Sequence, residues 1–109
     1  MEMVIKRFEI YLINLDPTIG SEIRKTRPCL IVSPDEINNN LNTLIIAPLT
    51  SVKKNYPTRV DCKFKNKSGQ IVLDQIRTID KKRLIKKLGE VNPGIQIRVL
   101  ETLNKIFSK

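Results

Sequence analysis

The chain has 109 residues, of which 20 are Lys or Arg, 11 are Asp or Glu and none is His, so its formal net charge is +9. Its length supports one core, and 40% apolar with 28% charged residues is typical of a globular protein, so we expect a single domain over residues 1–109. The basic excess favours a polyanionic partner, either nucleic acid or an acidic protein, and the lack of histidine excludes Ser-His-Asp triads and histidine-based metal sites.

The first strand is predicted over residues 8–15 (FEIYLINL), which end at the turn signal Asp16–Pro17. Residues 18–26 (TIGSEIRKT) are polar and contain glycine, which indicates a loop. Residues 27–33 (RPCLIVS) indicate a second strand. These segments predict two strands that are joined by a polar loop.

A short helix is predicted after the second strand. Ser33 can cap it, Pro34 suits the first helical position, and Glu36 has the spacing of a capping box. We expect the helix to be brief because three asparagines follow at residues 38–40.

The middle of the chain predicts further strands. Residues 43–51 (TLIIAPLTS) are almost wholly apolar, which favours a central strand covered on both faces. Residues 58–64 (TRVDCKF) alternate between apolar and charged side chains, as in a strand with one buried face. We expect a hairpin-like turn at residues 66–69 and a last long strand at residues 69–76.

The final quarter is predicted to be helical. Asp80 can cap and Gly89 can end a helix containing KKRLIKKL, and Asn92–Pro93 opens a second helix that runs to about Phe107. The apolar stripe of this last helix fits core packing alone or core packing with a dimer contact. The stripe comprises Ile95, Ile97, Val99, Leu100, Leu103, Ile106 and Phe107.

Together these elements predict a mainly β fold of the α+β class. About five strands form a small barrel or strongly twisted antiparallel sheet, and helices follow at the end. Cys29 and Cys62 are too few for a disulfide framework, and we expect both to be reduced and buried. Two cysteines without histidine also make a poor zinc site, so we expect no metal or other cofactor.

Targeting signals are not apparent in the sequence. The segment MEMVIKRFEIYL lacks the apolar core and cleavage site of a signal peptide. The apolar runs stay well short of the roughly 20 residues that span a bilayer. We therefore expect a cytoplasmic protein that does not enter the membrane.

Polar and basic side chains gather at the predicted strand ends. If these ends converge, they form a basic cleft with hydroxyls, amides and one aromatic ring, which suits single-stranded nucleic acid. The alternative is an ordinary solvated surface, because loops are polar in most proteins. The residues are Glu22, Arg24, Lys25, Arg27, Thr50, Ser51, Lys53, Lys54, Tyr56, Asp74, Gln75 and Arg77.

Some of these residues have the chemistry that RNA cleavage requires. Attack by a 2′-OH on the neighbouring phosphate needs a base, a group that stabilises the phosphorane, and assistance to the leaving 5′ oxygen. Glu22 is a candidate base, Arg27 a candidate phosphate clamp, and Thr50 a candidate donor to a non-bridging oxygen. Arginine keeps a pKa above roughly 12, so its main role would be electrostatic. The structural alternatives are an N–H cap for Glu22, a salt bridge for Arg27 and a strand-end hydrogen bond for Thr50.

Three segments at these positions resemble the MazF/PemK toxins of bacterial toxin–antitoxin systems, and the likeness extends over residues 8–107. They are LDPTIGSE at residues 15–22 with the following Thr26-Arg27-Pro28, APLTS at residues 47–51, and VLDQIRTID at residues 72–80. The resemblance implies an SH3-like barrel of the CcdB/PemK type with a C-terminal helix. It also implies a homodimer.

The implied activity is a metal-independent and ribosome-independent endoribonuclease that cuts single-stranded RNA at short sequences. The products would carry a 2′,3′-cyclic phosphate and a 5′-OH. An acidic, MazE-like antitoxin would lay a partly disordered segment across the RNA groove.

The resemblance also assigns residue roles. The principal catalytic arginine of the family falls on Arg27, its catalytic threonine on Thr50, and the acid proposed as base in some members on Glu22. Other members have a histidine at the position of Ser21 and an arginine at that of Leu73, so this chain departs from that variant. We expect Ser21 to contact RNA together with the strand-end residues.

Two other functions fit a small barrel. CcdB-type toxins, which the chain also resembles in fold, poison DNA gyrase without catalysis, a role that gives no reason to keep Arg27 with Thr50. A non-catalytic nucleic-acid-binding barrel would bind RNA in a salt-sensitive way and leave it unchanged. Cleavage in the presence of a chelator distinguishes the enzyme from both alternatives.

Overall fold

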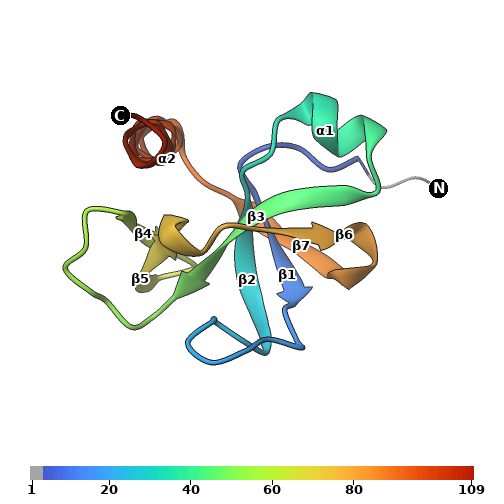
Figure 1. Ribbon diagram of the computed structural model, residues 1–109, viewed down its shortest axis with the longest axis horizontal. Coiled ribbons are helices and arrows are strands. Elements are labelled where there is room, and N and C mark those ends of the chain that lie inside the picture. The colour runs from blue at the N-terminus through green and yellow to red at the C-terminus, as the bar shows by residue number, and fades with distance from the viewer. Residues whose placement is uncertain (1–3) are drawn as a thin grey trace.

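In the computed structural model, which describes residues 4–109, the chain forms a curled antiparallel sheet that is followed by a helix (Figure 1). The strand order is β4-β5-β3-β2-β1-β7, and β6 also pairs with β3. The predicted class, mainly β within α+β with a C-terminal helix, is confirmed. The strands are β1 (Glu9–Asn14), β2 (Thr26–Ile31), β3 (Thr43–Thr50), β4 (Arg59–Phe64), β5 (Lys67–Val72), β6 (Arg77–Asp80) and β7 (Leu84–Glu90).

The helices are α1 (Asp35–Asn40) and α2 (Pro93–Ile106), with short 3-10 turns at η1 (Leu73–Gln75) and η2 (Lys81–Arg83). The predicted last helix is confirmed, and the Asn92 side chain caps it by accepting a hydrogen bond from the Ile95 N–H at 2.9 Å. Among residues 4–109, no helix has the length and apolarity required to cross a membrane.

The strand β3 lies at the centre of the sheet, as its apolar sequence predicts. It pairs with β2 on one side, and β6 and β5 follow one another along its other side. Alternate residues of β3 point to opposite faces, with Ala47 in one buried cluster and Leu44 and Ile46 in the other. The strand is therefore covered on both faces.

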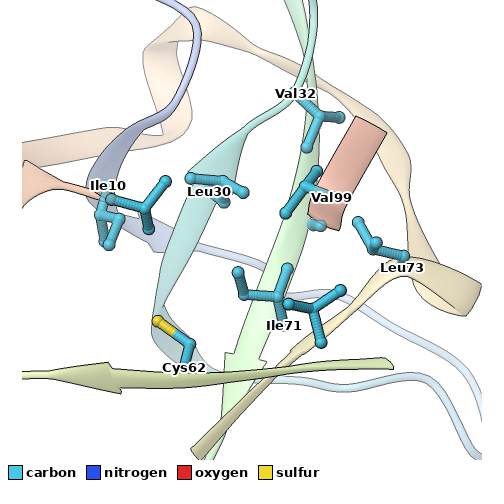
Figure 2. Close-up of a cluster of buried hydrophobic side chains, with 10 residues drawn as sticks. Ile10, Leu30, Val32, Cys62, Ile71, Leu73 and Val99 are labelled. Carbon is cyan, nitrogen blue, oxygen red and sulfur yellow. The ribbon is translucent and has the colours of Figure 1, made fainter. Parts of the chain in front are cut away.

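The first of these clusters lies between the sheet and α2. Figure 2 shows Val99 of α2 close to Leu30 of β2 and Ile71 of β5. Both cysteines are buried free thiols, as predicted, and Cys62 belongs to this cluster. Three apolar residues that widen the predicted stripe of α2, Ile97, Leu100 and Phe107, are instead exposed.

The prediction of a turn at residues 66–69 is wrong by two residues. The β4–β5 hairpin turns at Lys65 and Asn66, and both have positive φ values, 51° and 64°. These values are typical of a two-residue hairpin turn with the twist of the flanking strands. Gly69 lies inside β5, opposite Cys62.

The prediction of one long strand at residues 69–76 is also wrong, because η1 divides it. Leu49 pairs with Ile71, so an unbroken strand would bring residue 74 opposite Ile46, whereas Arg77 occupies that place. The register of β5 and β6 on β3 leaves three residues without a place in the ladder. These are the residues of η1, which turn the chain out of the sheet between β5 and β6.

The predicted helix around KKRLIKKL is wrong. Asp80 does accept a hydrogen bond from the Lys82 N–H at 2.8 Å, but only the short turn η2 follows. The chain then forms β7, which pairs with β1. The main-chain groups of β1 need a partner on that side, and this sheet pairing overrides the local helical preference of the lysines.

The short helix α1 is confirmed, but its details differ from the prediction. Pro34 is the cap rather than the first helical residue, and the three asparagines lie inside the helix. The Ser33 hydroxyl binds the side chain of Asn38 at 2.5 Å and accepts from the Ile45 N–H at 3.1 Å. Ser33 therefore connects α1 to β3 instead of capping the helix.

Candidate functional site

Three surface pockets contain most of the predicted site residues. We call them the strand pocket (about 250 Å³), the loop pocket (about 410 Å³) and the helix pocket (about 360 Å³). The predicted residues are Arg27, Thr50 and Ser51 in the strand pocket, Ser21, Glu22, Asp74, Gln75 and Arg77 in the loop pocket, and Lys54 and Tyr56 in the helix pocket.

The strand pocket brings Arg27 and Thr50 together from neighbouring strands. Cys29 of β2 pairs with Pro48 of β3, and Arg27 and Thr50, which each lie two residues from this pair, line the same pocket. The next strand over contributes Gln70, which pairs with Thr50 across the β3–β5 ladder. The pocket thus forms where the ends of β2 and β3 meet the middle of β5.

Hydrogen bonds to the backbone hold both side chains. The Nε of Arg27 donates to the Arg24 carbonyl at 3.0 Å, and its terminal nitrogens have no acceptor among residues 4–109. The hydroxyl oxygen of Thr50 accepts from the Val52 N–H at 3.2 Å. A guanidinium and a hydroxyl therefore share one half-buried site, and each can still donate hydrogen bonds to a ligand.

The loop between β1 and β2 forms one wall of the loop pocket. Its base is closed by Leu15 N–H donating to the Lys25 carbonyl at 3.0 Å and Lys25 N–H donating to the Asp16 carboxylate at 2.9 Å. Within it, the Glu22 carboxylate accepts from the Ile19 N–H at 3.1 Å. Glu22 therefore caps a backbone N–H, which was the structural alternative to a role as base. It also lies in a different pocket from Arg27.

Two predicted RNA contacts attach this loop to the sheet. The Gln75 side-chain oxygen accepts from the Ile23 N–H at 2.9 Å, and Arg77 donates to the Leu15 carbonyl at 3.1 Å. Residues of η1 and β6 therefore position the loop. The remaining predicted residues, Arg24, Lys25 and Lys53, are exposed and lie outside the three pockets.

Asp74 forms an ion pair with Arg59. The carboxylate accepts from Arg59 Nε at 3.2 Å and from the Thr58 hydroxyl at 2.9 Å. Burial raises the pKa of Asp74, but these hydrogen bonds and the Arg59 charge outweigh burial and hold the pKa below its ordinary value. Asp74 is therefore a partner of Arg59 in this structure.

Cys29 lies beneath the site, close to two cations. Burial raises the pKa of its thiol to about 12, although Arg27 and Arg77 act in the opposite direction. The thiol consequently stays protonated, and both positive charges remain available at the surface of the neighbouring pockets.

The helix pocket contains residues that the sequence reasoning did not single out. Besides Lys54 and Tyr56, it is lined by Arg59 and Gln70 from the sheet and by Arg98 from α2. The sequence offered one sign of this pocket, the polar residue Gln70 directly before the apolar end of β5. In the structure its side chain is only 6% exposed. Among residues 4–109, no group of three or more His, Cys, Asp or Glu side chains could hold a metal ion.

The chain is similar to known toxins over nearly its whole length. A family model described as "PemK-like, MazF-like toxin of type II toxin-antitoxin system" matches residues 6–107. The protein named Endoribonuclease EndoA from Bacillus subtilis is 36% identical over 107 residues, which cover 93% of this chain and 92% of that protein. Endoribonuclease MazF from Staphylococcus epidermidis is 37% identical over 107 residues, covering 93% of this chain and 89% of that protein.

Solved structures with the same fold are also similar in sequence. MazF from Deinococcus radiodurans superposes with a TM-score of 0.85 at 26% identity, and the match covers 96% of this chain and 97% of that one. A mycobacterial endoribonuclease in complex with its cognate antitoxin has a TM-score of 0.78 at 26% identity, covering 92% and 91% of the two chains.

Proposed function

Since the chain belongs to the PemK-like, MazF-like family of type II toxins, we propose that it is a toxin that cleaves single-stranded RNA at short specific sequences. The relatives named endoribonucleases, at 36% and 37% identity, support this activity. The observation that carries the proposal is the adjacency of Arg27 and Thr50 in the strand pocket. A gyrase poison or a simple binding barrel would need neither residue.

Arg27 stabilises the transition state. When the 2′-OH attacks the neighbouring phosphate, a phosphorane forms with extra negative charge on its non-bridging oxygens. The planar guanidinium can donate two parallel hydrogen bonds to such oxygens, and its Nε bond to Arg24 fixes the position of the group in advance. Preorganised donors of this kind stabilise developing charge at no cost in reorganisation.

Thr50 supplies a second donor. Because its oxygen already accepts from the Val52 N–H, its own proton is available for a phosphate oxygen. As the P–O5′ bond breaks, the strand pocket holds the charge on the cyclic phosphate, and the leaving 5′ oxygen takes a proton from water. The products are a 2′,3′-cyclic phosphate and a 5′-OH, and the residues assigned here require no metal ion.

Glu22 is the proposed base that takes the 2′ proton. Its carboxylate now caps the Ile19 N–H in the loop pocket, so this role requires the loop to rearrange when RNA binds. The loop contains Gly20 with a positive φ of 59°, a conformation that glycine adopts without strain. The hydrogen bonds to Gln75 and Arg77 hold the loop to the sheet on either side of the segment that would move.

Partners of three kinds are proposed. Single-stranded RNA and an acidic MazE-like antitoxin both complement the net charge of +9. A related endoribonuclease has been solved with its cognate antitoxin, which supports an antitoxin partner. The third partner is a second copy of the chain, and the exposed apolar residues Ile97 and Leu100 of α2 and Phe107 at its C-terminal cap support a homodimer.

The test is cleavage of labelled single-stranded RNA in excess chelator. We expect discrete cuts with 5′-OH ends from the wild type, and a loss of about 10²–10³-fold in Arg27→Ala. Arg27→Lys keeps the charge but loses the planar pair of N–H donors, so it should recover only part of the rate. Wild-type cleavage that disappears with the chelator, or Arg27→Ala protein that cuts at the wild-type rate, would refute the mechanism.

A further inference from the structure

The helix pocket is joined to the strand pocket through Gln70. This side chain lines both pockets, is buried, and pairs with Thr50 across the β3–β5 ladder. Its amide holds the backbone of Lys54 twice, accepting from the N–H at 2.9 Å and donating to the carbonyl at 3.0 Å. The start of the β3–β4 loop is therefore fixed between the two pockets, and a strand of RNA leaving Thr50 would reach the helix pocket next.

The helix pocket contains a ready surface for a nucleobase. The Arg59 guanidinium lies 5.0 Å from the centre of the Tyr56 ring, and Asp74 holds Arg59 by the ion pair described above. Tyr56 is nevertheless 52% exposed. Such an exposed ring backed by a fixed cation is a platform on which a base can stack.

Cations surround this platform from two elements. Lys54 belongs to the β3–β4 loop, and Arg98 and Lys105 project from α2, which packs against β4 (Figure 1). Arg98 is held in place by donating to the Asp61 carbonyl at 2.7 Å. Three positive groups around one exposed ring can neutralise the phosphate of a nucleotide.

The acidic groups of the pocket add hydrogen-bond acceptors to the stacking surface. Asp61 and Glu101 also line it, and their charge opposes a phosphate as much as a peptide carboxylate, so the preference for a nucleotide comes from the ring and from these acceptors. The same groups can accept hydrogen bonds from the exocyclic amines of a base. The mixture of ring, cations and acceptors therefore fits a base and its phosphate together.

We propose that the helix pocket binds one nucleotide of the RNA substrate beyond the cleaved phosphate, with its base on Tyr56 and its phosphate near Lys54, Arg98 and Lys105. This proposal rests on the proposed RNA-cleaving function. It adds α2 to the substrate surface and predicts that residues outside the strand pocket set the length of RNA that is bound tightly.

The experiment compares cleavage of a long RNA and of trimmed RNAs. The long probe is a labelled single strand of about 12 nucleotides around a mapped cut, a length within the range that small barrels bind. The trimmed probes lose nucleotides one at a time from either end. Two variants, Tyr56→Ala and Lys105→Gln, are paired with the controls Tyr56→Phe, which keeps the ring, and Lys86→Gln, which removes an exposed charge of β7 that does not line the pocket.

We expect both variants to raise KM for the long RNA by about 5–10-fold with kcat unchanged, as for loss of one stacked base or one phosphate contact. Lys105→Gln should also reduce the slope of log KM against log salt by about 0.7. Lys86→Gln should match the wild type, and Tyr56→Phe, which keeps the ring, should have a KM much closer to the wild type than Tyr56→Ala. On RNA trimmed past the bound nucleotide, the variants and the wild type should have equal KM values.

Equal KM values for all proteins on every RNA would overturn the subsite while leaving the cleavage activity intact. Weaker binding of a synthetic Glu-rich peptide by Lys105→Gln, with an unchanged KM for RNA, would also overturn it and assign the pocket to an acidic protein. If the wild type cuts none of these probes, the proposed function itself fails, and this outcome is distinct from the other two.

Discussion

Gly69 of β5 lies so close to Thr50 of β3 that a Cβ atom at position 69 would stand 2.5 Å from the Thr50 carbonyl oxygen. That atom belongs to the backbone, so it cannot turn aside as a flexible side chain would. Both residues line the strand pocket. Residue 69 therefore limits how closely β5 can approach the end of β3 that carries Thr50.

Gly69→Ala should damage both the fold and the activity. The added methyl group must push β3 and β5 apart, which we expect to lower the free energy of unfolding by about 1–3 kcal/mol. The displaced Thr50 should reduce kcat more than stability alone explains. Denaturant unfolding and RNA cleavage measure the two effects, with Lys63→Ala, an exposed change in the neighbouring strand β4 and outside the three pockets, as control. A Gly69→Ala protein with wild-type stability and rate would contradict the close approach.

The hydroxyl of Thr50 is the group that we expect to matter at that position. Thr50→Val keeps the branched shape and loses the donor, so kcat should fall by about 10²-fold with little change in KM. Thr50→Ser keeps the hydroxyl and should retain most of the rate. Single-turnover cleavage at saturating RNA provides the comparison. Equal losses in the two variants would show that shape, and not the donor, is required.

The Asp74–Arg59 ion pair predicts a pH dependence of stability. Because the pKa of Asp74 in the folded state is lowered from its ordinary value of 3.8, the pair stabilises the protein above that value, and the stabilisation is lost as pH falls through the lowered pKa. Asp74→Asn should therefore have a lower Tm than the wild type at neutral pH. The difference should close at acid pH.

Thermal melts across this pH range test the prediction. In an Arg59→Gln background, Asp74→Asn should have a much smaller pH-dependent effect, because the partner that lowers the pKa of the carboxyl has been removed. A constant Tm difference between Asp74→Asn and the wild type at every pH would show that the effect is one of packing and not of charge.

The thiol of Cys29 should resist alkylation in the folded protein. A pKa of about 12, against an ordinary value of 9.0, leaves about 10³-fold less thiolate at the same pH, and the thiolate is the reacting form. Iodoacetamide labelling followed by peptide mass spectrometry reports the rate at each cysteine. Protein unfolded in urea is the control and should react as an ordinary thiol. Rapid labelling of native Cys29 would refute the burial described here.

The sequence predicted the elements that have a strong local signal. Period-two alternation located β4, the apolar run located β3, and Asn92 with Pro93 located the start of α2. Each signal depends on residues close together in the chain, with side chains that face one core. The same locality explains why the segments of Arg27 and Thr50 could be recognised from the sequence, whereas their position in one pocket could not.

The errors fall where distant strands decide the structure. Residues 84–90 form β7 because β1 offers an unpaired edge, and the run of lysines and leucines carries no sign of that distant partner. The break at η1 likewise comes from the register of two strands on β3, which no local pattern of Leu73–Gln75 specifies. Tertiary pairing overrode local preference in both places.

The candidate site shows the same division. Arg27 and Thr50 could be predicted, but their separation from Glu22 into a different pocket depends on the conformation of the β1–β2 loop. The positions of Arg98 and Lys105 in the helix pocket could not be predicted, because the apolar stripe of α2 specifies only the face that packs on the core. The packing of α2 against β4 determines which charged residues of α2 lie beside the β3–β4 loop.

The order of strands in the sheet has a consequence for how the protein avoids aggregation. The strands at the two ends of the sheet path, β4 and β7, both carry an exposed lysine, Lys63 on β4 and Lys86 on β7. An unpaired strand edge invites a strand from a neighbouring molecule, and like charges on both edges repel that approach. We therefore expect these two lysines to oppose the joining of copies of the chain edge to edge.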